Sequence, residues 1–111
     1  MVTSYIFLAG ASRGVGREIA NCLTAQENQV KALLRTEEKR QELEAMGITV
    51  ALGDALNIDD VEKVILAEEK IDIVISTIGG VPKDSERADY LGNKNLIDAA
   101  VKAGVKKFIL I

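Results

Sequence analysis

The chain has 111 residues, 48% of them hydrophobic, and a formal net charge of -3. This length fits one small domain, and the mixing of Lys and Arg with Asp and Glu argues against a nucleic-acid partner. With no histidine and one cysteine, metal sites of the Cys/His kind, Ser-His or Cys-His nucleophile pairs and an internal disulfide are excluded.

The hydrophobic residues are mainly Ile, Leu, Val and Ala, because the chain contains only two Phe and two Tyr. This composition suits a buried parallel sheet. No run approaches the roughly 18 apolar residues of a membrane span, and the N-terminus lacks the pattern of a signal peptide. We therefore expect a soluble cytoplasmic protein without a membrane partner. The lone Cys22 fits a reducing compartment, and we expect it on the inner face of the first helix.

An apolar strand is predicted at residues 5–9, directly before a glycine-spaced turn at 10–16. A helix follows at once, with Ile19, Cys22 and Leu23 on one face. Strand, glycine turn and helix in this order are typical of a site for the diphosphate of a dinucleotide. The alternative is a structural turn without a ligand.

Short apolar runs then alternate with amphipathic stretches. Thr36 is the expected N-cap of the next helix, which Gly47 ends, and Asn57 is the expected N-cap of the helix after it. The remaining predicted strands are 30–34, 48–52, 71–76 and 107–111. The remaining predicted helices are 36–46, a segment carrying Ile58, Val61, Val64 and Ile65, and about 86–103. The last of these has a stripe of small and apolar residues and ends at Gly104; the stripe consists of Gly92, Leu96, Ala99, Ala100 and Ala103.

Five strands joined by four helices, with no hairpin turn, predict an α/β fold with right-handed crossovers. We expect a three-layer structure, in which helices cover both faces of a parallel sheet with strand order 3-2-1-4-5. Ligands bind such sheets beyond the carboxyl ends of the strands, where the order reverses. The candidate site therefore comprises the residues that follow Ala9, Leu34, Leu52 and Ser76.

The sequence stops at Ile111 inside the fifth apolar run, without a polar cap. We therefore expect residues 1–111 to form one domain that is truncated at its fifth strand. The exposed edge of this strand would favour self-association.

Within the glycine turn, Gly10 permits the tight bend away from the strand. Gly14 and Gly16 keep side chains away where the backbone meets the pyrophosphate and where the helix meets the sheet. The full set of expected cofactor contacts is Gly10, Ser12, Arg13, Gly14, Val15, Gly16, Arg35, Thr36, Asp54, Ala55, Thr77, Ile78, Gly79 and Gly80.

Two arginines bear on the choice of cofactor. A cofactor with a free ribose 2′-OH usually meets Asp or Glu after the second strand, where this chain has Arg35. Arg13 adds a second guanidinium, and two cations favour the 2′-phosphate of NADP(H) over NAD(H). Against this, Glu37 and Glu38 follow closely, and an exposed Arg is most often only solvated.

The other expected contacts follow the third and fourth strands. Asp54 can accept a hydrogen bond from the adenine amino group, with Ala55 and Leu56 beside the ring. A turn or helix-capping role for Asp54 is an equal alternative. Residues 77–80 offer small side chains and free amides to the middle of the cofactor.

The segments GASRGVG, LLRT, GDAL and DYLGNKNLIDAAVKAGVKKFIL resemble the short-chain dehydrogenase/reductase superfamily, in its atypical NmrA-like NAD(P)-binding branch. The resemblance covers essentially the whole chain. It implies a Rossmann fold that binds NADP(H) at residues 10–16, Arg35, Asp54 and residues 77–80. Ala9 departs from the Thr of many members, and STIGG replaces the Asn-rich motif of the main branch. The family's Ser and its Tyr-x-x-x-Lys pair would fall after Ile111, so the catalytic residues are unknown.

Tyr90 and Lys94 do match Tyr-x-x-x-Lys, with Ser76 upstream. On one helix face, the ammonium group could lower the pKa of the phenol for proton transfer. The pair lies one strand-helix unit too early for the family, so we expect coincidence rather than catalysis.

The predicted function is the NADP(H)-binding domain of an oxidoreductase that lacks its substrate-binding and catalytic part. One alternative is a non-catalytic, NADP-sensing regulatory or assembly protein. A nucleotide-sugar epimerase fragment is a further alternative, and Arg35 argues against it.

Overall fold

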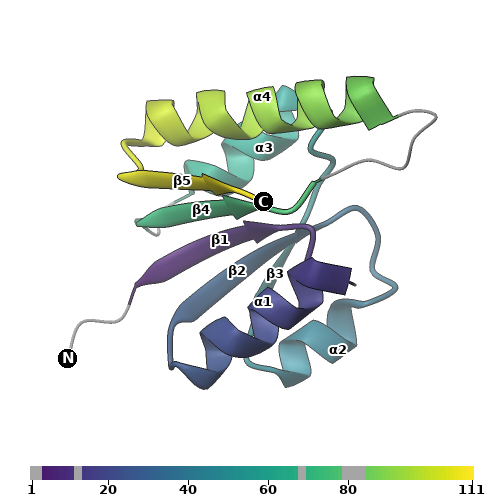
Figure 1. Cartoon of the computed structure of the whole chain (residues 1–111), viewed down its shortest axis with the longest axis vertical. Coiled ribbons are helices and arrows are strands. Elements are labelled where there is room, and N and C mark those ends of the chain that lie inside the picture. Colours follow the sequence, from purple (N-terminus) through teal and green to yellow (C-terminus); the bar gives the residue numbers. More distant parts are fainter. Residues whose placement is uncertain (1–3, 12–13, 68–69, 79–84) are drawn as a thin grey trace.

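The computed structural model describes residues 4–11, 14–67, 70–78 and 85–111. Its centre is a parallel sheet in the order β3-β2-β1-β4-β5, as predicted (Figure 1). The register places Phe7 of β1 opposite Lys31 of β2 on one side and Val74 of β4 on the other. The strands are β1 (Tyr5–Ala9), β2 (Gln29–Leu34), β3 (Thr49–Leu52), β4 (Ile73–Ser76) and β5 (Lys107–Leu110).

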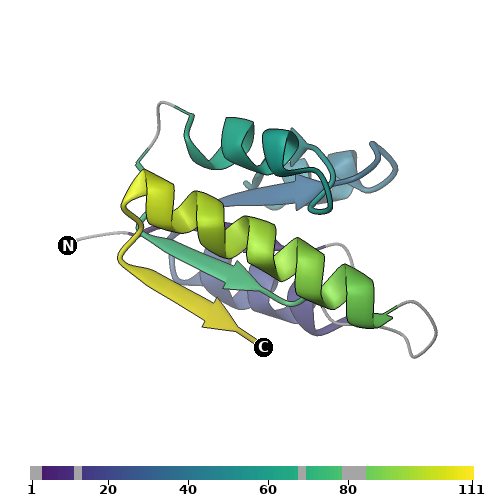
Figure 2. The ribbon, with the colours of Figure 1, turned by 90° about the horizontal axis from the view of Figure 1, so that it is seen from above.

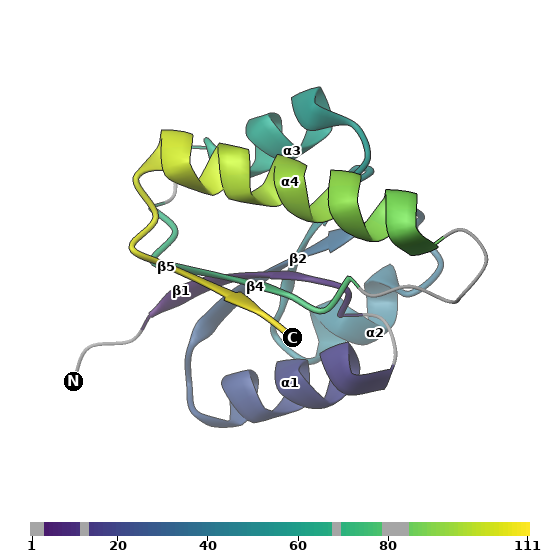
Figure 3. The ribbon, with the colours of Figure 1, turned by 45° about the horizontal axis from the view of Figure 1, so that its top comes forward.

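The described helices cover both faces of the sheet and complete a Rossmann-like three-layer α/β fold. Figures 1 and 3 show α1 (Gly14–Ala25) and α2 (Arg40–Ala45) on one face, and α3 (Ile58–Ile65) and α4 (Ser85–Ala103) on the other. Seen from above in Figure 2, α4 runs along β4 and β5, beside α3. Each helix connects two parallel strands, as a crossover connection requires.

The sheet separates two hydrophobic cores, because successive side chains of a strand point to opposite faces. Ile6 and Leu8 of β1 pack in the core under α1 and α2, together with Leu43. Phe7 belongs to the core under α3 and α4, together with Leu96. Both cores consist almost entirely of aliphatic side chains, as the composition indicates.

Capping residues fix several helix boundaries as predicted. The Asn57 side chain accepts hydrogen bonds from the amides of Asp59 at 2.9 Å and Asp60 at 3.3 Å, which identifies it as the N-cap of α3. Gly47 and Gly104 follow the ends of α2 and α4 with positive φ angles.

The predicted start of α2 at Thr36 is wrong. Helix α2 begins at Arg40, and its N-cap position is Lys39, without a side-chain cap. The amide of Arg40 donates to the carbonyl of Glu37 at 3.0 Å, so a turn precedes the helix. The Arg40 guanidinium also binds the Glu37 carboxylate at 2.9 Å, which stabilises that turn.

The predicted burial of Cys22 is also wrong, because its thiol group is exposed. The inner face of α1 is formed by Gly16 and Ala20, with Ile19 and Leu23 packed beside them. Cys22 follows Ala20 by two positions, which is about 200° around a helix, so it lies well outside this face.

Strand β5 forms an edge of the sheet, and residues near its end are exposed, with Leu110 at 57% and Ile111 at 59%. In the described part of the chain, none of the helices combines the length and apolar character needed to cross a membrane.

Candidate dinucleotide-binding site

Segments that follow four strands meet around one cavity at the carboxyl edge of the sheet. The cavity has a volume of about 220 Å³. Its position agrees with the site expected where the strand order reverses between β1 and β4. The lining residues are Ala9, Gly10, Leu33, Leu34, Arg35, Gly53, Asp54, Ala55, Leu56 and Ile78.

The glycine turn brings the start of α1 directly against the end of β1. A Cβ atom on Gly16 would overlap the carbonyl oxygen of Gly10, so the helix could not approach this closely with any other residue. Gly10 has a φ of +95°, and a Cβ atom there would overlap Oγ1 of Thr77. These two glycines therefore perform the packing roles that the sequence predicted.

The start of α1 suits a bound anion. Gly14 has a φ of +63°, and a Cβ atom added there would meet open space, with no heavy atom within 4 Å. Gly14 and Val15 are exposed, and the first turn of α1 contains no acidic residue. The partial positive charge of this helix end is therefore not offset by a carboxylate of that turn, and a diphosphate fits here.

Thr77 connects the loop after β4 to the glycine turn. Its hydroxyl lies within donating distance of two carbonyl oxygens, at 3.1 Å from Ala9 and 3.1 Å from Gly10. Its amide donates to the Ala9 carbonyl at 3.0 Å. Thr77 thus belongs to the site as a residue that shapes the turn.

Arg35 lines the cavity just after β2 and is exposed, whereas Thr36 is exposed and lies outside the cavity lining. The structure therefore brings only one of these two predicted contacts to the cavity. The nearby Glu37 is bound by Arg40, so its carboxylate is already paired.

Asp54 lines the cavity and also forms a turn. One carboxylate oxygen accepts from the amide of Leu56 at 2.9 Å, and the amide of Asp54 donates to Asp60 at 3.0 Å. The turn role that the sequence left open is therefore present. Ala55 and Leu56 line the same cavity.

Sequence reasoning missed Asn93 and Asn95, two buried asparagines of α4. The Asn95 amide donates to the carbonyl of Ala55 at 2.8 Å, and the Asn93 amide donates to the carbonyl of Ile78 at 3.2 Å. The available signal was polar residues beside Gly92 and Leu96, within the apolar stripe of the helix.

The predicted contacts Ser12, Arg13, Gly79 and Gly80 lie outside the described residues.

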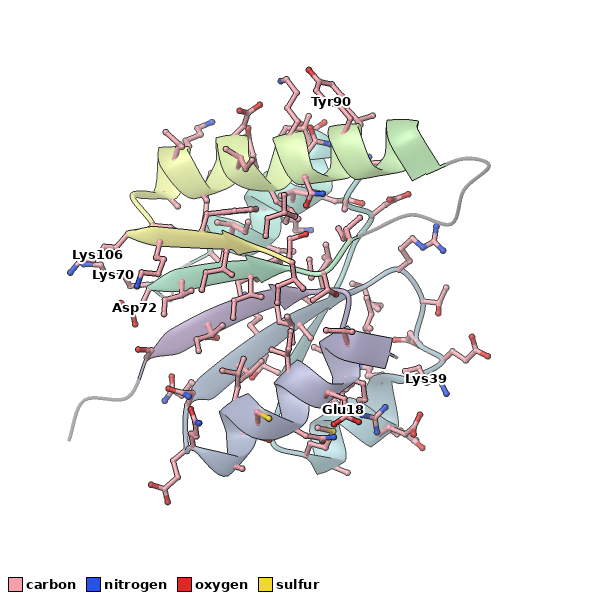
Figure 4. All side chains as sticks on the ribbon, in the orientation of Figure 1. Glu18, Lys39, Lys70, Asp72, Tyr90 and Lys106 are labelled. Atoms are coloured by element: carbon pink, nitrogen blue, oxygen red, sulfur yellow. The ribbon has the colours of Figure 1, made fainter. Side chains whose placement is uncertain are left out.

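Tyr90, Lys94 and Ser76 do not form a catalytic arrangement. Tyr90 is 69% exposed and lies on the side of α4 away from the sheet (Figure 4). Lys94 binds Asp98 at 2.9 Å, which raises the pKa of the Lys94 ammonium group. Ser76 is fully buried, and its hydroxyl donates to the side chain of Asn93.

Among the described residues there is also no group of three His, Cys, Asp or Glu side chains that could hold a metal ion.

Two curated proteins and one solved structure illustrate what the chain is similar to. It is 34% identical to the photosystem II assembly factor Ycf39 of Synechocystis over 94% of this chain and 32% of that protein. It is 33% identical to a phenylcoumaran benzylic ether reductase of Ginkgo biloba over 98% of this chain and 35% of that protein. The chain thus spans about a third of the length of these relatives.

The structure resembles the anaerobillin reductase ChuY of Escherichia coli O157:H7, with a TM-score of 0.81 and 31% identity over 96% of this chain and 50% of that one. The sequence profile described as NAD(P)H-binding matches residues 10–111. The predicted resemblance to the short-chain dehydrogenase/reductase superfamily is confirmed. With its glycine turn, its strand order and a profile match over nearly its whole length, the chain belongs to the NAD(P)H-binding family.

Proposed function

We propose that residues 1–111 form the cofactor domain of a cytoplasmic, NmrA-like oxidoreductase and bind NADP(H) in preference to NAD(H). The observation that carries this preference is the position of Arg35 in the cavity lining. A guanidinium there suits the 2′-phosphate that distinguishes the two cofactors. The substrate-binding and catalytic groups would belong to parts of the protein outside this chain.

The charges around Arg35 support the proposal. Within the described residues Arg35 has no carboxylate partner, whereas Arg17 binds Glu42 at 3.5 Å. Glu37, which could compete with a phosphate for Arg35, is bound by Arg40 at 2.9 Å. The guanidinium of Arg35 is therefore available to an anionic ligand.

The other residues of the site suit the rest of the cofactor. The start of α1 at Gly14 would receive the diphosphate. Asp54 and Ala55 would lie beside the adenine ring, since they line the cavity together with Arg35. We propose the same place for Ile78, which the sequence predicts at the middle of the cofactor, because it lines this cavity too. Bound in this way, the cofactor would supply a nicotinamide that exchanges hydride with a substrate.

Isothermal titration calorimetry with NADPH and NADH tests the proposal. Arg35→Asp should weaken NADPH binding by roughly 10- to 100-fold, the range expected for a lost charged hydrogen bond, and leave NADH binding unchanged. Lys106→Asp is the matched control, because it makes the same charge change at the opposite end of the sheet (Figure 4). A wild-type preference for NADH, or an unchanged NADPH affinity in Arg35→Asp, would contradict the proposal.

A second candidate is a regulatory or assembly protein that binds NADP without turning over a substrate. The similarity to the photosystem II assembly factor favours it. The discriminating measurement is NADPH oxidation by the protein with carbonyl substrates. Tight cofactor binding without any turnover by the full-length protein would favour this second candidate.

We further propose that the chain self-associates through the edge of β5. Its exposed Leu110 and the adjoining Ile111 support this proposal, since edge strands with exposed apolar side chains tend to pair. Sedimentation of the wild-type chain and of Leu110→Lys should show an oligomer that the substitution abolishes. A monomeric wild-type chain at high concentration would rule it out.

A further inference from the structure

Helix α4 carries two buried amides that the packing of the helix does not require. Asn93 is 9% exposed and Asn95 is 6% exposed, although the neighbouring buried positions are Gly92, Leu96 and Ala99. Burying an amide is unfavourable unless it is hydrogen-bonded, so the partners of these two side chains indicate their role.

Asn95 holds the loop that follows β3. Its amide nitrogen donates to the carbonyl oxygen of Ala55 at 2.8 Å, across 40 residues of sequence. Ala55 lines the cavity between Asp54 and Leu56. The backbone of this loop is thereby tied to α4.

Asn93 holds the loop that follows β4. Its amide nitrogen donates to the carbonyl of Ile78 at 3.2 Å, and its oxygen accepts from the hydroxyl of Ser76. That hydroxyl in turn accepts from the amide of Ile78 at 3.2 Å. Both backbone polar groups of Ile78 are therefore fixed by one small network.

Gly92 lies next to both loops. A Cβ atom placed on it would be 3.6 Å from Cβ of Ala55 and 3.7 Å from Cγ2 of Ile78. Ala55 and Ile78, which both line the cavity, therefore meet at the same turn of α4. The hydrogen bonds of Asn93 and Asn95 fix these two residues relative to each other.

We infer that Asn93 and Asn95 are positioning residues that set the relative placement of Ala55 and Ile78, and with it the shape of the adenine end of the cavity. The inference rests on the proposed cofactor site. It assigns control over the affinity for the base to α4, although none of the described side chains of this helix (residues 90–103) lines the cavity. A helix that merely covered the sheet would need no such amides.

The test uses Asn93→Ala and Asn95→Ala, with calorimetric titration of NADPH and NADH. Each variant should bind both nucleotides about fivefold more weakly, the effect of one lost buried hydrogen bond, because the adenine is common to both. This equal loss of affinity for the two nucleotides differs from the effect of Arg35→Asp, which should weaken the binding of NADPH alone. Lys102→Ala is the control: it removes an exposed contact of α4 with Glu62, at 3.2 Å, and should leave both affinities unchanged.

Amide hydrogen exchange of the ligand-free variants provides a second readout. Exchange at Ile78 should accelerate in Asn93→Ala, and exchange at Leu56 should accelerate in Asn95→Ala, while Lys102→Ala changes neither. If Asn93→Ala does not fold, Ser76→Ala replaces it in the titrations only, because this substitution removes the hydroxyl contact of Asn93 but also the acceptor of the Ile78 amide.

The outcomes separate the two proposals. Variants that melt at lower temperature, yet bind both nucleotides with wild-type affinity and show unchanged exchange, would overturn the inference. A wild-type chain that binds neither nucleotide would refute the proposed function. In that case the exchange rates at Ile78 and Leu56 alone decide whether α4 positions the two loops.

Discussion

The hydroxyl of Thr77 is 3.1 Å from the carbonyl oxygen of Gly10, a residue 67 positions earlier in the chain. The same hydroxyl is 3.1 Å from the carbonyl of Ala9. The shape of the glycine turn therefore depends on a side chain that enters from the loop after β4. This relationship makes Thr77 a structural part of the turn, in addition to its predicted role as a cofactor contact.

Thr77→Val should lower the free energy of unfolding by about 1 kcal/mol, because the hydroxyl is lost while the branched shape is kept. It should also weaken NADPH binding by distorting the turn. Urea denaturation and calorimetry measure the two effects. Thr77→Ser keeps the hydroxyl and should stay close to wild type. Equal behaviour of the two variants would show that the hydroxyl does not hold the turn.

Gly16→Ala should be strongly destabilising, by about 3 kcal/mol, because its Cβ atom would overlap the Gly10 carbonyl and force α1 away from β1. Gly92→Ala is the matched control within another helix. Its Cβ atom would have ordinary contacts, 3.6 Å from Ala55, and alanine should stabilise the helix by about 0.5–1 kcal/mol. Chemical denaturation of both variants checks the prediction, and a stable Gly16→Ala protein would contradict it.

Asn57→Ala should lower the free energy of unfolding by about 1 kcal/mol, since it removes the N-cap of α3. Thr36→Ala should change stability by less than about 0.5 kcal/mol, because Thr36 is exposed and caps no helix. Thermal or urea unfolding of the pair measures the difference. A larger loss of stability in Thr36→Ala than in Asn57→Ala would contradict the finding that Asn57 is an N-cap and Thr36 is not.

Glu42 should titrate below the ordinary range of a glutamate. Lys39, which binds it at 3.3 Å, lowers the pKa of the Glu42 carboxyl, and Arg17 at 3.5 Å adds to the effect. Because the pKa is lower in the folded state, the stabilisation is present above the unfolded pKa and is lost as the pH falls through the folded pKa. Carboxyl chemical shifts followed by NMR should show this, and Lys39→Met should move the pKa of Glu42 upward. High salt should reduce the shift, since the pair is exposed.

The fold could be predicted because its signals are local or periodic. Alternating apolar runs and helical stretches predict the parallel sheet, and the order 3-2-1-4-5 follows from right-handed crossovers. The cap at Asn57 depends only on the next three residues, so its prediction was also correct. The tight turn at Gly10 and the close helix packing at Gly16 were predicted from their place between β1 and α1, whereas their contacts with a cofactor stay predictions.

The predictions that were wrong or missing have different causes, two of them local and one a contact between distant residues. Thr36 has the chemistry of an N-cap, but Arg40 pairs with Glu37 and Glu44 and α2 starts later. The sequence predicts Cys22 on the buried face of α1, but its position around the helix leaves the side chain exposed. The hydrogen-bond partner of Asn95 could not be predicted, because Ala55 lies 40 residues away in the sequence. The position of an asparagine in a helix does not show which distant carbonyl its side chain will bind.

The pairing of β1 with β4 has a consequence for how the protein acquires its site. Phe7 is opposite Val74, so the centre of the sheet closes a loop of more than sixty residues. Contacts between residues so distant in sequence form slowly compared with local ones. A peptide ending before β4 would contain the whole glycine motif, but it would lack β4, one of the two strands that pair with β1, and the Thr77 hydroxyl that holds the turn. The motif emerges early in synthesis, and it becomes a binding site only when the second half of the chain has arrived.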